Sequence, residues 1–256
     1  MHLARIRRLV AITLAGAVIL SLPGIVAAGH SWGSYHWARQ SNPFTLKLGD
    51  NVSSAWDPYL ATTSSDWGAS SVLDTTIVAG GAARPKQCRA TSGRVEVCNA
   101  KYGFNGWLGV AQIWASGSHI TQGTVRVNDS YLGAAPYNSA AWRNLVMCQE
   151  VGHTLGLGHN DENFNNTPTG TCMDYSNDPV PNQHPNAHDY AQLESIYEHL
   201  DSTTTLSSAP AGSSAAGAGV AGFGRLVAMS HGGRVATYVL ELGRGVTVIS
   251  HVIWAR

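Results

Sequence analysis

Charged residues are scarce in this chain, and no segment after residue 28 is strongly basic. Charged side chains make up 12% of the 256 residues, with 16 basic and 16 acidic groups. Residues 1–28 hold three of the basic groups and none of the acidic ones, so the remainder carries 13 basic against 16 acidic side chains. Because proteins bind nucleic acid through clustered Lys and Arg that neutralise phosphates, we expect no nucleic-acid partner.

Long apolar runs are lacking too, apart from one at the N-terminus. There, three arginines precede an apolar run at 9–22, followed by Pro23 and small residues that end at Ala28. This order predicts a cleaved export signal over residues 1–28, and the run is short for a membrane-spanning helix of about 20 residues. We therefore expect a secreted, extracellular protein that is monomeric and has no membrane span after cleavage.

Cysteine is also rare, with four residues in the whole chain. In an exported protein an even number of cysteines favours disulfides over free thiols. Cys88 and Cys98 bracket a short polar stretch and could close a hairpin, while Cys148 and Cys172 each precede a motif described below. Four cysteines allow three pairings, and all three are open on spacing alone.

The most informative segment is Gln-Glu-Val-Gly-His-Thr-Leu-Gly-Leu-Gly-His at residues 149–159. Residues four apart share one face of a helix, so Gln149 and His153 can reach the same metal. Glu150, one step round the helix, can reach water beside that metal. The segment therefore predicts a helix that supplies two metal ligands and a base.

Gly156 stands where the chain must leave this helix by a sharp turn, which favours a residue that tolerates positive φ. The turn would bring His159 back toward the metal as a third ligand. Three protein ligands leave the fourth position of a zinc ion open, where the pKa of water falls to about 7 and a carbonyl group is polarised. With a carboxylate to take and return the proton, this arrangement suits peptide hydrolysis.

These residues resemble the zinc signature of the metzincin metalloendopeptidases, H-E-x-x-H-x-x-G-x-x-H, and 153–159 is most similar to the matrixin branch. The segment 172–175, Cys-Met-Asp-Tyr, resembles the methionine turn of that family, whose methionine lies beneath the metal without binding it. The resemblance covers about residues 35–200 and implies a zinc endopeptidase that acts on protein or peptide substrates. It also implies an α/β (α+β) fold with a mixed twisted sheet, an active-site helix and a methionine turn.

The resemblance assigns roles to the residues of both motifs. It implies Glu150 as the general base and Zn²⁺ as the cofactor, with Met173 beneath the metal. The metal ligands that it implies are Gln149, His153 and His159. Tyr175 could donate to the oxyanion of the tetrahedral intermediate or simply pack the turn, and a Cys148–Cys172 disulfide would join the helix to the turn.

Gln149 departs from the family, which has histidine at this position. Its amide oxygen can reach a metal but is a poorer zinc donor than an imidazole nitrogen, so the metal would be bound more loosely. Because the other motif residues are complete, we favour a working site. The alternative is a catalytically inactive secreted binding protein on the same scaffold, with the site weakened by Gln149.

Two acidic residues follow the motif. Asp161 is disfavoured as a zinc ligand because His159 already occupies the position three beyond Gly156. Asp161 and Glu162 more simply cap or solvate the loop, or help to hold a structural Ca²⁺ ion.

Other histidines offer weaker signals. His119 has no matching cluster of histidine and carboxylate near it in the sequence, which favours a loop histidine over a second metal site. Pro185 breaks the helix that would align His184 with His188, so structural or exposed roles are favoured for both.

Composition divides the chain into an export signal at 1–28, a metzincin-like catalytic domain at 29–200, a Ser/Ala/Gly-rich linker at 201–222 and a small β module at 223–256. Alternating segments between glycine turns predict three strands in that module, at 225–229, 234–242 and 246–254.

Within the catalytic domain, hydrophobic periodicity predicts both strands and helices. The metzincin resemblance implies that the strand at 124–128 forms an edge of the sheet beside the cleft, where an extended peptide could add as one more strand. The segment 88–98 is expected to form a hairpin. The other expected strands lie at 44–48, 72–78 and 108–115, and the expected helices at 53–69, 138–155 and 186–200.

Overall fold

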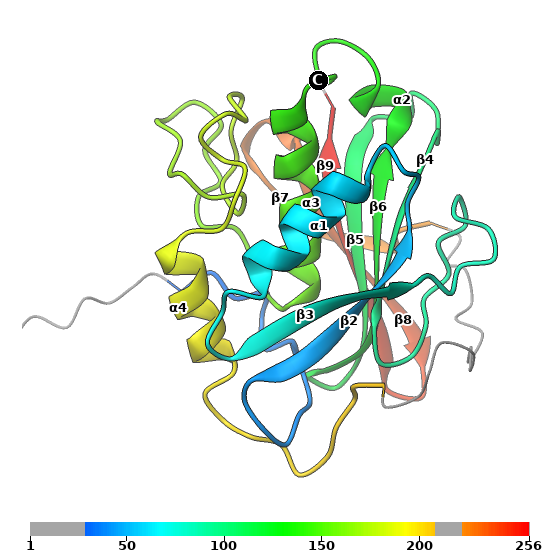
Figure 1. The fold of residues 1–256 in the computed structure, drawn as a ribbon, viewed down its shortest axis with the longest axis vertical. Coiled ribbons are helices and arrows are strands. Elements are labelled where there is room, and N and C mark those ends of the chain that lie inside the picture. The colour runs from blue at the N-terminus through cyan, green and yellow to red at the C-terminus, as the bar shows by residue number, and fades with distance from the viewer. Residues whose placement is uncertain (1–28, 208–221, 256) are drawn as a thin grey trace, which may run out of the picture.

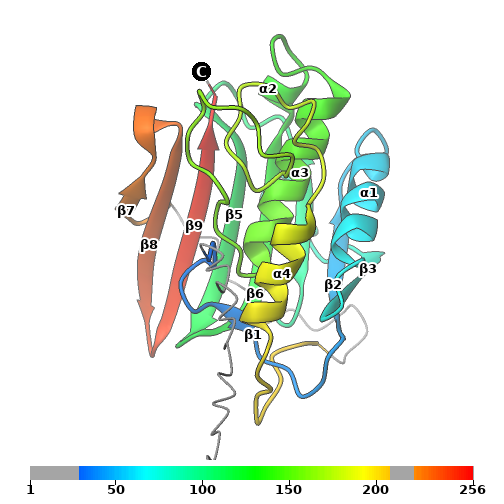
Figure 2. The ribbon, with the colours of Figure 1, turned by 90° about the vertical axis from the view of Figure 1, so that its left-hand side faces the viewer.

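One twisted mixed sheet runs through the described chain, with helices on one face (Figures 1 and 2). A computed structural model describes residues 29–207 and 222–255. The predicted export signal and residues 208–221 of the predicted linker lie outside the described residues. The mixed α/β fold predicted from the sequence is confirmed.

The first six strands and the last three belong to the same sheet. Across the described residues the order is β3-β2-β4-β6-β5-β9-β8-β7, and β1 pairs with β6. Strands β2, β3, β4 and β6 run parallel, whereas β5 is antiparallel to both of its neighbours. The strands are β1 (His36–Trp37), β2 (Phe44–Asn51), β3 (Leu73–Ala79), β4 (Val95–Ala100), β5 (Trp107–Ser116), β6 (His119–Asn128), β7 (Arg225–Met229), β8 (Val235–Gly243) and β9 (Val246–Trp254).

The C-terminal strands extend this sheet. Strand β9 pairs with β5 along its length, from Trp107 opposite Trp254 to Ser116 opposite Val246. Strands β8 and β7 follow in antiparallel hairpin order. The three strands predicted in this tract are therefore present, and they continue the sheet formed by β1–β6.

The helices are α1 (Asp57–Trp67), α2 (Asp129–Leu132), α3 (Ala140–Thr154) and α4 (Ala187–Ile196), with a short 3-10 turn at His231–Gly233. Helix α3 begins at Ser139, whose side chain accepts a hydrogen bond from the Trp142 backbone. Every residue of α3 from Leu145 to Thr154 is buried, because the helix lies between the sheet and the loops that follow it. This buried helix carries the first half of the zinc-type motif.

Two expectations about the sheet were wrong. Residues 124–128 belong to β6, which lies between β4 and β5 and is therefore an internal strand. Residues 88–98 form a loop that enters β4, a strand parallel to β2 and β6, and not a hairpin. Both errors concern which strands become neighbours, and local alternation of apolar and polar residues carries no information about that order.

Both disulfides join segments that the fold brings together. Cys88 pairs with Cys98, which fixes the loop before β4 to the strand itself. Cys148 pairs with Cys172, which connects α3 to the methionine turn. The described residues contain no free cysteine.

No helix among the described residues is long and apolar enough to cross a membrane.

Gly156 ends the turn after α3 in a backbone conformation that residues other than glycine rarely adopt. Its φ is +96°, and a Cβ atom would lie 2.3 Å from the Tyr35 carbonyl oxygen. A Gly156→Ala variant should therefore lose about 2 kcal/mol or more of unfolding free energy, from backbone strain and the clash together. Urea denaturation followed by circular dichroism measures this loss.

Gly170→Ala is the matched control for that variant. Gly170 also has a positive φ, +76°, but its Cβ would meet nothing within 4 Å. It should lose only the smaller cost of the left-handed backbone, about 1 kcal/mol. Equal losses in the two variants would contradict the role given to the Tyr35 contact.

Candidate metal centre

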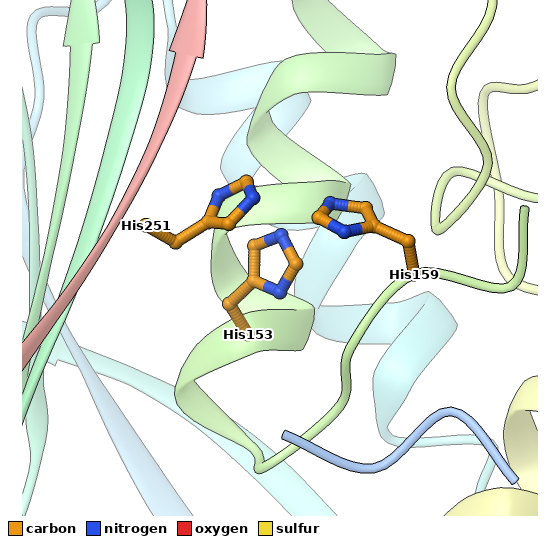
Figure 3. Close-up of side chains that lie close together, drawn as sticks. All are labelled: His153, His159 and His251. Carbon is orange, nitrogen blue, oxygen red and sulfur yellow. The ribbon is translucent and has the colours of Figure 1, made fainter. Parts of the chain in front are cut away.

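Three histidines from separate parts of the chain converge on one point (Figure 3). His153 comes from the last turn of α3, His159 from the loop after it and His251 from β9. One ring nitrogen from each lies within 4.8 Å of the other two. The ring centroids of His153 and His251 are 3.7 Å apart, and His159 lies 4.6 Å from both.

The facing nitrogens of these histidines have no hydrogen-bond partner. The Nε2 atoms of His153 and His159 and both ring nitrogens of His251 are buried and unpaired. His153 Nδ1 lies 2.8 Å from the Leu157 carbonyl oxygen and donates to it, which leaves a lone pair on Nε2. Burying several unpaired polar atoms is costly. A zinc ion could bind one nitrogen from each of the three histidines, so these residues fit such a metal.

Burial keeps these imidazoles neutral. Burial and the neighbouring His251 lower the pKa of His153 to about 3, and burial lowers the pKa of His251 to about 3. The pKa of His159 is also well below its usual value, chiefly through burial. A metal binds only the neutral imidazole, so at neutral pH no proton has to be displaced.

Small residues on the neighbouring strands flank His251. On β9 it lies opposite Ala111 of β5 and Thr237 of β8. His251 was not predicted from the sequence, because it lies far from the motif in a segment predicted to form a separate module. The one signal was an isolated histidine within the otherwise largely apolar run 246–254.

Glu150 lies beside the histidines in a fully buried position. Its Oε2 atom is 3.6 Å from His251 Nδ1, and neither carboxylate oxygen has a hydrogen-bond partner. Burial raises the pKa of Glu150 to about 8, although nearby His153 opposes the shift. Gly109 on β5 leaves the space for this side chain, because a Cβ there would lie 2.6 Å from Glu150 Oε1.

Gln149 is held by the methionine turn. Its Nε2 atom donates to the Cys172 carbonyl oxygen at 2.9 Å, while Oε1 is buried and has no hydrogen-bond partner. Its role as a metal ligand stays a prediction, and the structure offers His251 as a competing third ligand.

Met173 and Tyr175 pack against the residues that carry the site. A Cβ at Gly152 of α3 would lie 2.5 Å from Met173 Sδ, so the methionine lies directly against the helix. The Tyr175 ring lies 3.8 Å from the His159 ring and is buried, and burial raises its pKa. On these contacts Tyr175 orients His159, while the predicted hydrogen bond to an oxyanion stays a prediction.

The histidines open onto a cavity of about 400 Å³. One wall comes from the N-terminal segment 29–32, and another from the loop around His159. Ala228 of β7 and Thr237 of β8 form part of the remaining wall. The C-terminal strands thus help to build the cavity as well as supplying His251.

Asp161 and Glu162 belong to none of the described groups of residues that could hold a metal. The Asp161 carboxylate instead accepts hydrogen bonds from the Asn163 backbone and the Asn166 side chain. These contacts are those of a loop-capping residue, and they give the expected Ca²⁺ ion no support.

No known protein family matches the chain, and no curated protein resembles it significantly. Among solved structures, the chain is similar to high choriolytic enzyme 1, a hatching enzyme zinc-protease from the medaka fish Oryzias latipes. That match has a TM-score of 0.35 and 13% sequence identity, and covers 64% of this chain and 95% of the fish enzyme. So low a TM-score carries no argument about this chain, and function must be argued from its own residues.

Proposed function

We propose that the protein is a secreted zinc-dependent endopeptidase whose metal is held by His153, His159 and His251. One observation carries the proposal: three imidazoles face one another, each with a buried ring nitrogen that has no hydrogen-bond partner, and the buried carboxylate of Glu150 lies 3.6 Å from one of them. Perturbed titratable groups beside a cavity are typical of active sites.

Glu150 is the general base in this proposal. A bound zinc ion would polarise the substrate carbonyl and favour deprotonation of water. As water attacks the peptide carbon, Glu150 accepts its proton, and the same carboxyl group then passes that proton to the leaving nitrogen. Burial excludes competing solvent from the carboxylate, while the pKa of about 8 lies close to neutral pH, where a carboxyl group can both accept and return a proton.

His251 is a better third ligand than Gln149 because an imidazole nitrogen is the stronger donor to zinc. The Gln149 amide donates to Cys172 through Nε2, and its unpaired Oε1 is the weaker alternative donor. In this assignment β9 replaces the histidine that the helix lacks.

Pairing of β9 with β5 changes how a substrate must approach. Addition of a peptide strand to β5 is blocked, because β9 occupies its edge. We infer that the substrate instead enters the cavity between segment 29–32 and strands β7 and β8. A cavity of about 400 Å³ is within the usual range for a ligand site.

The same pairing favours the second candidate, a secreted binding protein without catalysis. Glu150 and His153 are 0% and 1% exposed, so the site is more enclosed than an open peptidase groove.

Cleavage assays decide between the endopeptidase and the binding protein. The protein lacking residues 1–28, loaded with zinc, should cleave quenched-fluorescent peptide mixtures, lose activity with a chelator and regain it with added zinc. If the protein cleaves no peptide even when its catalytic centre holds one zinc ion, the binding protein is favoured.

A methyl group added at Gly109 should disturb the base without touching the metal ligands. The new Cβ would lie 2.6 Å from Glu150 Oε1 and displace the carboxylate. Because a displacement of about 1 Å can cost about 100-fold in rate, Gly109→Ala should lose roughly that much kcat/KM and keep its zinc. Gly123→Ala on β6 is the control, since its Cβ contacts are with Val95 and Thr154. Equal activities in the two variants would contradict the placement of Glu150.

A further inference from the structure

A second group of potential metal ligands joins the N-terminal segment to helix α4. His30, His188 and Asp189 each place one ligand atom within 4.8 Å of the other two. His188 and Asp189 lie in the first turn of α4, whereas His30 lies more than 150 residues earlier. None of the three is a metal ligand in the proposed catalytic centre, although His30 lines the cavity beside it.

The facing atoms of this group have no hydrogen-bond partner. His30 Nε2, His188 Nδ1 and Asp189 Oδ1 are all buried and unpaired. The side chains of His30 and Asp189 are only 3% and 0% exposed, so water cannot readily satisfy them. A cation bound between the three side chains would satisfy these atoms together.

Two of these side chains are held in place by hydrogen bonds at their opposite atoms. His30 Nδ1 lies 3.2 Å from the Gly158 carbonyl oxygen and donates to it, so Nε2 carries the lone pair. Asp189 Oδ2 accepts hydrogen bonds from the Thr171 hydroxyl and from the Asn186 backbone N–H, at 2.7 Å for the latter. Orientation of each ligand by a bond at its far side is the usual arrangement around a protein-bound metal.

The distance between His30 Nε2 and Asp189 Oδ1 fits two ligands of one metal ion better than a direct hydrogen bond. His30 Nε2 and Asp189 Oδ1 are 3.4 Å apart, whereas a charge-assisted N–H···O bond is about 2.7–2.9 Å long. Two ligands about 2.0–2.1 Å from a tetrahedral zinc ion lie about 3.3–3.4 Å apart. The imidazoles of His30 and His188 lie nearly parallel, with ring centroids 4.8 Å apart, and His188 is partly exposed.

A third group, His36, His119 and Asp201, differs in being satisfied already. Its histidines face Asp201 Oδ1, while Arg39 donates to Asp201 Oδ2 at 3.0 Å. The expectation of a loop histidine at 119 was wrong: His119 is the first residue of β6, and the fold brings His36 and Asp201 to it from distant segments. An arginine already neutralises that carboxylate, so this group carries no proposal.

We propose that His30, His188 and Asp189 form a second metal site, selective for zinc or a similar transition ion, separate from the catalytic centre. Two neutral imidazoles and one carboxylate are a donor set suited to such ions. The ion would tie segment 29–32 to α4. Through the bond from His30 to Gly158, it would also hold the loop that presents His159.

Counting zinc in single variants tests this site independently of the catalytic proposal. Zinc per chain is measured by elemental mass spectrometry after equilibration with zinc and removal of the excess. We expect two ions in the wild-type protein, one in His188→Ala, one in His153→Ala and two in His184→Ala. The last is a matched control, because exposed His184 contacts Asp66 and lies outside the group.

Each outcome decides between the two sites. If His188→Ala retains as much zinc as His184→Ala, the second site is refuted, and His30 and Asp189 form a metal-free pair. If wild type binds one ion and only His153→Ala loses it, the second site fails while the catalytic centre stands. Asp189→Asn is the second variant, since it keeps the shape of the capping residue; it too should lose one ion, with folding checked by circular dichroism.

Discussion

A His251→Ala variant should lose the catalytic zinc and, with it, peptidase activity. Removing one of three imidazole ligands leaves two. Mutating a residue that only hydrogen-bonds to a metal ligand typically lowers metal affinity by up to about 100-fold. Loss of a ligand itself should therefore lower zinc affinity by more than about 100-fold. Competition with a chromophoric chelator measures the affinity, and cleavage of a fluorescent peptide measures the activity.

Thr247→Ala is the control on the same strand. Thr247 also lies on β9, but its hydroxyl bonds to Glu241, away from the three histidines. It should keep both zinc and activity. Unchanged zinc affinity in His251→Ala would remove this histidine from the ligand set and return the third position to Gln149.

Replacing Glu150 by glutamine should reduce kcat by about 10²–10⁴-fold while the zinc content stays the same. An amide of nearly equal size fills the same buried space but cannot accept a proton, and a positioned general base contributes about that factor. Because Glu150 is not a ligand in our account, metal affinity should change far less than in His251→Ala.

Glu162→Gln provides the comparison for Glu150. Glu162 lines the cavity, is exposed and lies in the loop after His159. It should retain activity close to that of the wild-type protein. Equal cleavage by Glu150→Gln and Glu162→Gln would exclude Glu150 as the general base and show that cleavage proceeds without it.

Local sequence features predicted most of the helices and strands. The helix predicted at 138–155 agrees with the bounds of α3 to within two residues at each end, and the three C-terminal strands agree as closely. Gly156 has the positive φ that its position after the helix suggested. These features depend on near neighbours in the chain, so sequence alone can reveal them.

Contacts between distant segments could not be predicted. Pairing of β9 with β5 depends on which strand edge remains open after the rest of the sheet has formed, and this pairing is what brings His251 to His153. The second metal group likewise joins His30 to α4. An isolated histidine gives no local signal of its partners, so both groups became visible only in three dimensions.

A crystal structure of the zinc-loaded protein, with anomalous data collected at the zinc absorption edge, tests the central claim most directly. We predict an anomalous peak about 2.0–2.1 Å from one nitrogen each of His153, His159 and His251, with the Gln149 amide still donating to Cys172. A peak bonded to Gln149 Oε1, with His251 outside bonding distance, would contradict the account.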